Sequence, residues 1–163
     1  MLPKEFINAV LLNDLKRVTE TSAYLSFPLM AISIEFLGKC LDDTQDEWHK
    51  GKNKIDFNRA IIKLKAFECL SEKEHDTTEF LYQCLRNGMC HSLIPKMYDG
   101  WRIGLSRLDN APNLISVSNK HLVLQAPEFY KLIERAALEV IDMIDQKKFK
   151  ADSKMYQHIL SGP

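Results

Sequence analysis

The residues best suited to chemistry in this sequence lie in one short segment, from Arg86 to His91 (RNGMCH). Histidine can move protons near neutral pH because its ordinary pKa lies close to the working range. Arginine stays charged, and its planar fork can hold two phosphate oxygens at once. Asn87 could orient the imidazole or donate to a phosphate oxygen, and Gly88 would let a backbone approach closely. These residue types favour chemistry on a phosphodiester, without a metal or another cofactor.

A helix is expected to carry this segment. On a helical wheel, Asn87 and His91 fall at roughly 100° and 140° from Arg86, while apolar side chains such as Met89 take the opposite side. Asn87 and His91 are also four residues apart, which is close enough for a hydrogen bond on a helix. The pattern therefore predicts that Arg86, Asn87 and His91 converge at one helix edge.

The elements that would position this segment are mainly helices, because apolar residues recur at helical spacing over most of the chain. The first expected helix covers about 3–21, and the second begins near Ser26 with Pro28 in its first turn. A third helix is expected at about 56–70. A fourth should begin at a capping box formed by Asp76 and Glu79, and a long last helix should begin at Pro127. The second is apolar around most of its circumference and should be the most buried. Short connections favour an antiparallel bundle.

Between about 92 and 126 the pattern changes to short strands. Asp99-Gly100 is typical of a tight turn and would join 92–98 to 101–108 in a hairpin. The stretches 114–117 and 121–125 favour a second hairpin. The expected fold is mainly α, an antiparallel helical bundle with a small antiparallel β-sheet inserted before the last long helix. Residues from about 151 to 163 are expected to form a short extra helix or a frayed tail.

The composition predicts one domain over residues 1–163, because a chain of this length can bury its own core. Lys plus Arg equals Asp plus Glu at 22 each, which argues against binding to nucleic acid through a general excess of positive charge but leaves a local basic patch open. The N-terminus lacks the order of a signal peptide, and the most apolar stretch, 23–38, contains Glu35 and is expected to be too short for a bilayer. These observations predict a cytoplasmic protein with no membrane segment.

The four cysteines, Cys40, Cys69, Cys84 and Cys90, form no C-x-x-C pair. Zinc sites usually place two cysteines close together, so no structural metal is expected. Reduced, buried thiols in a cytosolic protein are the better interpretation.

The arrangement of Arg86, Asn87 and His91 resembles the signature of the HEPN domains. In that signature an arginine is followed after four to six residues by a histidine, often with a polar residue directly after the arginine. Here four residues separate Arg86 from His91. The resemblance extends loosely over residues 3 to 91 and the last helix from 127, and it leaves the region of about 92–126 as a β insertion into a HEPN-like bundle.

The resemblance implies a metal-independent endoribonuclease of toxin or defence type, as in many members. By this resemblance His91 would assist attack of the ribose 2′-hydroxyl and Arg86 would stabilise the phosphorane, leaving a 2′,3′-cyclic phosphate. Members often form homodimers in which two copies of the signature meet. Other members are non-catalytic modules that bind a nucleotide, RNA or a protein, and this is the alternative hypothesis.

One subset of the family works with a nucleotidyltransferase antitoxin and has tyrosine two residues after the histidine. Leu93 stands there in this chain, which argues against a regulatory modification at that position. An antitoxin partner is nevertheless among the partners that the resemblance implies.

Several of these residues also have a structural interpretation. Arg86 could be a surface charge paired with Glu79 or Gln83, and His91 could be satisfied by the last carbonyls of its helix. Glu35 could bind Arg86 or orient His91, but its spacing favours an ion pair with Lys39 at i+4. A helical interaction module with no chemistry at Arg86 or His91 is the third hypothesis.

Two further segments could contact RNA. Trp101, Arg102 and Arg107 could stack on bases and hold phosphates, although alternation of Trp101 with Ile103 is also typical of packing. The only locally basic loop surrounds Trp48 and is expected to be a solvated connection.

Overall fold

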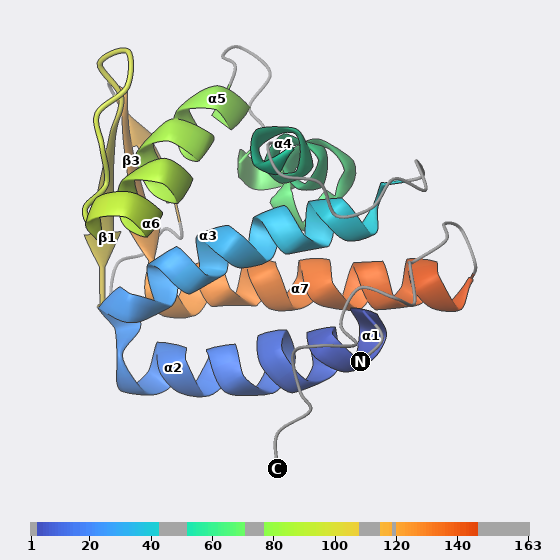
Figure 1. Ribbon diagram of the computed structural model, residues 1–163. Coiled ribbons are helices and arrows are strands. Elements are labelled where there is room, and N and C mark those ends of the chain that lie inside the picture. Colours follow the sequence, from blue (N-terminus) through green and yellow to red (C-terminus); the bar gives the residue numbers. More distant parts are fainter. Residues whose placement is uncertain (1–2, 43–51, 71–76, 108–114, 119, 147–163) are drawn as a thin grey trace.

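The computed structural model describes residues 3–42, 52–70, 77–107, 115–118 and 120–146. The fold is mainly helical, with a small sheet directly before the last long helix (Figure 1). This confirms the expected fold class at the level of its elements. The expected extra helix or tail at 151–163 lies outside the described residues.

The first helical run is unbroken from residue 3 to residue 21, as predicted. It consists of α1 (Pro3–Phe6), the π-helix η1 (Ile7–Asp14) and α2 (Leu15–Thr21). In a π-helix each carbonyl accepts a hydrogen bond from the N–H five residues further on, where an α-helix joins residues four apart. Two of these carbonyls, those of Leu11 and Leu12, accept a hydrogen bond from the Tyr130 hydroxyl, each at 3.2 Å. The run is thereby joined to the last helix.

The second helix, α3 (Ala23–Cys40), is the most buried of the helices that the structure describes, and it begins three residues earlier than expected. Pro28 therefore lies inside the helix and not in its first turn. With 18 residues and a mean hydropathy of 1.2, α3 is long and apolar enough to cross a membrane, so the expectation that it is too short was wrong. Of this helix 67% is buried within the structure, as in the core helix of a folded domain.

The helix expected at 56–70 is broken in two. Helix α4 (Asn53–Lys63) ends where Leu64 takes an extended conformation, and the 3₁₀ helix η2 (Lys65–Leu70) follows. The backbone N–H groups of Lys65 and Ala66 donate to the carboxylate of Glu139 on the last helix, at 3.2 and 3.4 Å. A carboxylate satisfies and stabilises the open N–H groups at a helix start, which explains why a new helix begins here.

The fourth helical run carries the predicted site and extends from residue 77 to residue 92. It comprises α5 (Thr77–Leu81), the π-helix η3 (Tyr82–Asn87) and α6 (Gly88–Ser92), and we call it the motif helix. The expected cap at Asp76 lies outside the described residues. Since η3 is π-helical, a wheel drawn at 100° per residue does not apply to Arg86 and Asn87.

The sheet has three strands, β1 (Arg102–Ser106), β2 (Ile115–Ser118) and β3 (His121–Gln125), in the order β1-β3-β2. Strands β2 and β3 form the predicted antiparallel hairpin. Strand β1 runs parallel to β3, so the prediction of a wholly antiparallel sheet was wrong.

The hairpin predicted at Asp99-Gly100 is reduced to its turn, where Tyr98 and Trp101 form an isolated antiparallel bridge. Its first arm does not become a strand because part of it belongs to α6 and Lys96 donates its N–H to the carbonyl of Cys84, at 3.0 Å. Strand β1 therefore pairs with β3, with Arg102 opposite His121.

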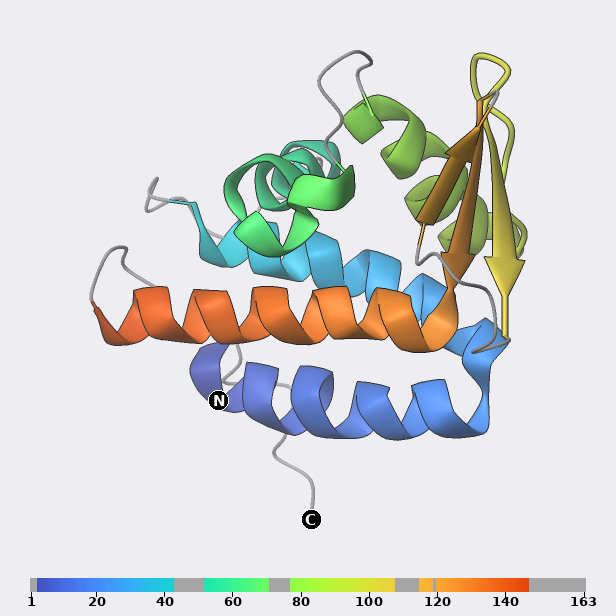
Figure 2. The ribbon, with the colours of Figure 1, turned by 180° about the vertical axis from the view of Figure 1, so that it is seen from behind.

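The last helix, α7 (Ala126–Asp145), lies beside α2 and α3 in both views (Figures 1 and 2). Helix α2 runs opposite to the other two, but α3 and α7 run in the same direction, so the helices do not simply alternate. The chain passes through α4, the motif helix and the sheet between α3 and α7, which returns it to the same end. Phe27 of α3 and Phe129 of α7 stack in the core, with ring centroids 6.3 Å apart.

Candidate functional site

The motif helix packs one line of side chains, four residues apart, against its neighbours. Tyr82 makes an edge contact with Phe57 of α4, with ring centroids 5.6 Å apart. Cys90 lies one turn beyond Arg86, with its sulfur 4.0 Å from the carbonyl oxygen of Pro28 on α3. Arg86 is the central member of this line and therefore points toward α3.

Arg86 forms an ion pair with Glu35 of α3, from Nε to Oε2 at 2.8 Å. Both side chains are mostly buried, with 13% and 19% of their surface exposed. Burial lowers the pKa of Arg86, but the hydrogen bond and charge of Glu35 more than offset this, so the pKa lies above its usual value. The expected pairing of Glu35 with Lys39 was wrong, since the Lys39 ammonium lies 3.3 Å from Asp42.

A chain of hydrogen bonds runs along the motif helix from this ion pair. Arg86 Nη1 donates to Asn87 Oδ1 at 3.4 Å, and Asn87 Nδ2 donates to Gln83 Oε1 at 3.0 Å. Gln83 Nε2 in turn donates to Glu79 Oε1 at 2.9 Å, and Glu79 pairs with Lys54 of α4 at 2.5 Å. Asn87 is thus held with its amide oxygen toward the guanidinium.

His91 lies in the last turn of α6 and is exposed. Within the described part of the chain it forms no hydrogen bond or ion pair, either with Asn87 or with the last carbonyls of its helix. Both arrangements expected from the sequence are therefore absent there. The structure places Arg86, Asn87 and His91 on one helix but joins only the first two.

Gly88 does permit a close backbone approach, but the approaching backbone is the chain's own. A Cβ atom at Gly88 would lie 2.6 Å from the nitrogen of Lys96 and 2.8 Å from the oxygen of Ile94. The chain turns back here through Leu93, whose φ of 57° is left-handed and whose carbonyl accepts from the Tyr24 hydroxyl at 2.6 Å. This side of the helix is filled and offers no room to a ligand.

Of the other residues predicted to contact RNA, the structure buries one and exposes two. Trp101 is 7% exposed and stacks on Phe80 with ring centroids 4.3 Å apart, so its role is packing. Arg102 and Arg107 are exposed, and the guanidinium of Arg107 lies 6.0 Å from the ring centre of Tyr24. The loop around Trp48 lies outside the described residues.

An exposed apolar surface next to the motif helix was not predicted from the sequence. It consists of Leu25, Leu29 and Ile32, which are 50%, 43% and 45% exposed. Their spacing places them on one stripe of α3, bordering the face that carries Glu35 and touches the motif helix. The spacing of these three residues can be seen in the sequence. Because the rest of α3 is also apolar, the sequence does not show which apolar face is exposed.

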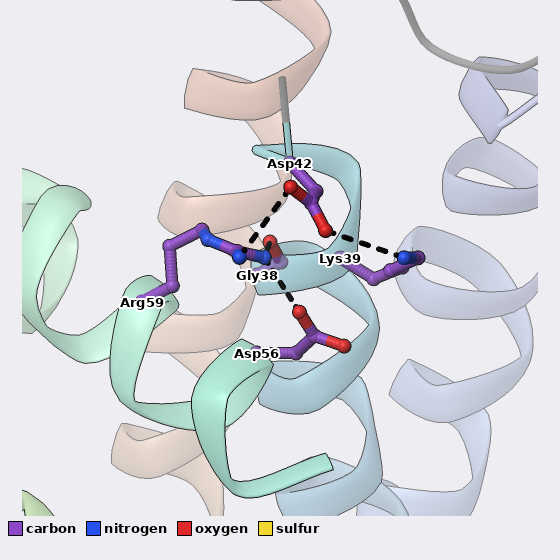
Figure 3. Close-up of polar contacts among 5 residues, drawn as sticks. All are labelled: Gly38, Lys39, Asp42, Asp56 and Arg59. Carbon is purple, nitrogen blue, oxygen red and sulfur yellow. Dashed lines mark hydrogen bonds and ion pairs between the residues drawn. The ribbon is translucent and has the colours of Figure 1, made fainter. Parts of the chain in front are cut away.

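A second charged cluster joins α3 to α4 (Figure 3). Arg59 donates from Nη1 to the carbonyl of Gly38 at 3.1 Å and pairs with Asp56 at 2.5 Å and with Asp42 at 3.5 Å. Lys39 pairs with Asp42 on the other side. Two positive and two negative side chains are matched, so the cluster is a structural link between the helices.

The candidate site combines an exposed imidazole, a fixed amide and a guanidinium held by a carboxylate. Among the described residues, no group of three or more His, Cys, Asp and Glu side chains could hold a metal ion. No family model, no curated protein and no solved structure matches this chain.

Proposed function

We propose that this chain is a metal-independent endoribonuclease of HEPN type that acts on cytoplasmic RNA in a toxin or defence setting. One observation carries the proposal: His91 and Arg86 lie on one helix with Asn87 between them, and Glu35 holds Arg86 in place. A positioned cation and a solvent-exposed imidazole suit the cleavage of a phosphodiester by its own 2′-hydroxyl.

In this proposal His91 takes the proton of the ribose 2′-hydroxyl. The 2′-oxygen then attacks the phosphorus, and the bond to the 5′-oxygen breaks as that oxygen takes a proton from solvent water. Since Nε of Arg86 faces Glu35 and Nη1 faces Asn87, Nη2 is the group that would meet the phosphorane. The products are a 2′,3′-cyclic phosphate and a 5′-hydroxyl.

We further propose that the chain acts as a homodimer. Arg86 is only 13% exposed, so a single chain offers RNA little of this cation. The apolar surface of Leu25, Leu29 and Ile32 borders the contact between α3 and the motif helix. Its burial against a second copy would bring two motif helices together and form a composite site. An antitoxin partner is a competing occupant of the same surface.

The alternative is a HEPN-like module that binds a nucleotide, RNA or a protein without cleaving it. Two observations favour it: Arg86 is already neutralised by Glu35, and no described residue orients the His91 ring. A base that is not oriented contributes less to catalysis than one that is.

Incubation of end-labelled RNA with the purified protein in excess chelator tests both proposals. We expect cleavage with 2′,3′-cyclic phosphate ends by the wild type and its loss in Arg86→Ala and His91→Ala. Matched controls are Arg17→Ala on α2 and His121→Ala on β3, because both side chains are exposed and neither is among the predicted RNA contacts. Equal cleavage by all variants would contradict the assignment. RNA binding without cleavage, weakened by Arg86→Ala, would establish the non-catalytic alternative.

A further inference from the structure

A pocket of about 530 Å³ lies between α2 and α7, on elements other than the motif helix. Its volume is within the range of about 300–1,000 Å³ that small-molecule sites usually have. Each helix contributes residues three and four positions apart, hence one face, and Arg107 adds a cation from the end of β1. The buried ring of Tyr130 forms part of its wall, and its hydroxyl is fixed by the carbonyls of Leu11 and Leu12.

The pocket carries charges of both signs that do not neutralise one another. Lys16, Glu20 and Glu134 all line it, and none forms a hydrogen bond or ion pair with any other residue in the described ranges. Arg107 contacts the ring of Tyr24, and Lys131 is bound to Glu128 at 2.6 Å. Charged side chains that line one cavity without pairing with each other can bind a ligand. Such a ligand would carry both an anionic group and N–H donors.

These charges are arranged along the pocket. Pro127, at the start of α7, lines the pocket with Arg107, and the N-terminus of this 20-residue helix adds positive potential there. Glu134 lies seven residues further along α7, which is about 10 Å of helix. Because α2 runs opposite to α7, Glu20 lies toward the Arg107 end of the pocket and Lys16 toward the Glu134 end. Arg107 and the start of α7 can take an anion at one end, and the carboxylate of Glu134 can accept hydrogen-bond donors at the other. The carboxylate and ammonium that share the α-carbon of an amino acid are too close together to reach both ends.

We propose that this pocket binds a nucleoside monophosphate, with the phosphate at Arg107 and the start of α7 and the base edge at Glu134. Arginine and helix N-termini are both good partners for phosphate. A carboxylate accepts two N–H groups from one base edge, and guanine presents two adjacent donors. GMP is therefore the expected ligand. The proposal does not depend on ribonuclease activity at His91.

Calorimetric titration of the full chain with GMP, AMP, CMP, UMP, guanosine and inorganic phosphate tests the proposal. We expect GMP to bind most tightly and to raise the melting temperature more than phosphate or guanosine does. Arg107→Gln and Glu134→Gln should each weaken GMP binding about tenfold or more, as expected for loss of a hydrogen bond to a charged group. The matched control is Arg17→Gln, an exposed arginine of α2 outside the pocket, which should stay within about twofold.

Three results would overturn the proposal. They are the absence of binding by every nucleotide at millimolar concentration, equal stabilisation by phosphate alone, and GMP binding that Arg107→Gln and Glu134→Gln leave unchanged. If GMP binding is instead lost in His91→Ala, the ligand occupies the motif helix and not this pocket. Failure of RNA cleavage with retained GMP binding would reject the proposed ribonuclease and leave the pocket standing.

Discussion

Arg86 on the motif helix and Glu35 on α3 are joined by a largely buried ion pair, with 2.8 Å between Nε and Oε2. The two residues are 51 positions apart in the sequence, so the contact ties the candidate site to the central helix of the fold. Removal of one partner from a buried pair leaves the other charge poorly solvated, which costs more than the pair itself contributes.

We expect Glu35→Gln to lower the free energy of unfolding by about 1–3 kcal/mol, because Arg86 would keep its charge without its carboxylate. Urea unfolding of this variant, Arg86→Gln and the double variant gives the coupling energy, which should be about 1 kcal/mol or more. The exposed pair of Lys131 and Glu128 is the control and should couple by less than about 0.5 kcal/mol. A coupling as small as that of the control pair would mean that Glu35 does not hold Arg86.

Gly88→Ala should destabilise the protein by about 1–3 kcal/mol, because the new methyl group would meet the backbone of Ile94 and Lys96. The sign of this change in stability is informative, since alanine in place of glycine normally stabilises a helix by about 1 kcal/mol. Gly104→Ala is the matched control: its nearest neighbour, 3.1 Å away, is the exposed side chain of His121, which can move. Thermal melting of both variants is the measurement, and a stabilised Gly88→Ala would contradict the close approach.

The four cysteines should react with iodoacetamide at very different rates. Burial raises the pKa of Cys40 to about 12 and that of Cys84 to about 11, from 9.0. For Cys40 this lowers the thiolate population at pH 8 by about a thousandfold, and the folded protein also blocks access. Cys69 is exposed and Cys90 is partly buried. Mass spectrometry after timed alkylation should find Cys69 modified first and Cys40 and Cys84 only after unfolding. Early modification of Cys84 would contradict the packing of the motif helix.

Asp56 makes the stability of the α3–α4 link depend on pH (Figure 3). Burial raises the pKa of Asp56 above its usual value, against the opposing effects of Arg59 and Lys39. Below the ordinary pKa of 3.8, Asp56 is protonated in both the folded and the unfolded state. As the pH rises through the higher folded pKa, ionisation is less favourable in the folded state, so this contribution to stability is lost.

Relative to Asp56→Asn, the wild type should therefore lose free energy of unfolding as the pH rises from about 4, and the difference should then level off. Urea unfolding of both proteins between pH 3.5 and about 7 measures this difference. A wild type that gains stability over Asp56→Asn across this interval would show that Arg59 and Lys39 outweigh burial.

Local patterns in the sequence predicted the elements that depend on local interactions. The helical run from residue 3 to residue 21 and the last helix, expected from Pro127 and beginning at Ala126, were found nearly as expected. The hairpin of β2 and β3 was also predicted, because two short apolar stretches flank a polar turn. Apolar periodicity and turn residues act over a few positions and are legible without the fold.

Other elements could not be predicted because their causes are distant. The helix expected at 56–70 is broken where Glu139, more than 70 residues away, caps a new start. Strand β1 is parallel to β3 because the arm before Asp99 is occupied by its packing against the motif helix. The π-helical turns changed which side chains share a face, and the uniform helical wheel could not show this.

The sequence by itself determined that Arg86, Asn87 and His91 share one helix end, since five positions of a helix keep residues together whatever the fold. Only the tertiary structure decided which of them interact. Glu35 binds Arg86, Asn87 turns to Gln83, and His91 is left in solvent. It also decided that Gly88 receives the chain's own backbone and that charged residues of α2 and α7 line one pocket with Arg107, which follows β1. Such contacts depend on how helices pack across long separations, and burial of apolar faces, not local spacing, sets that packing.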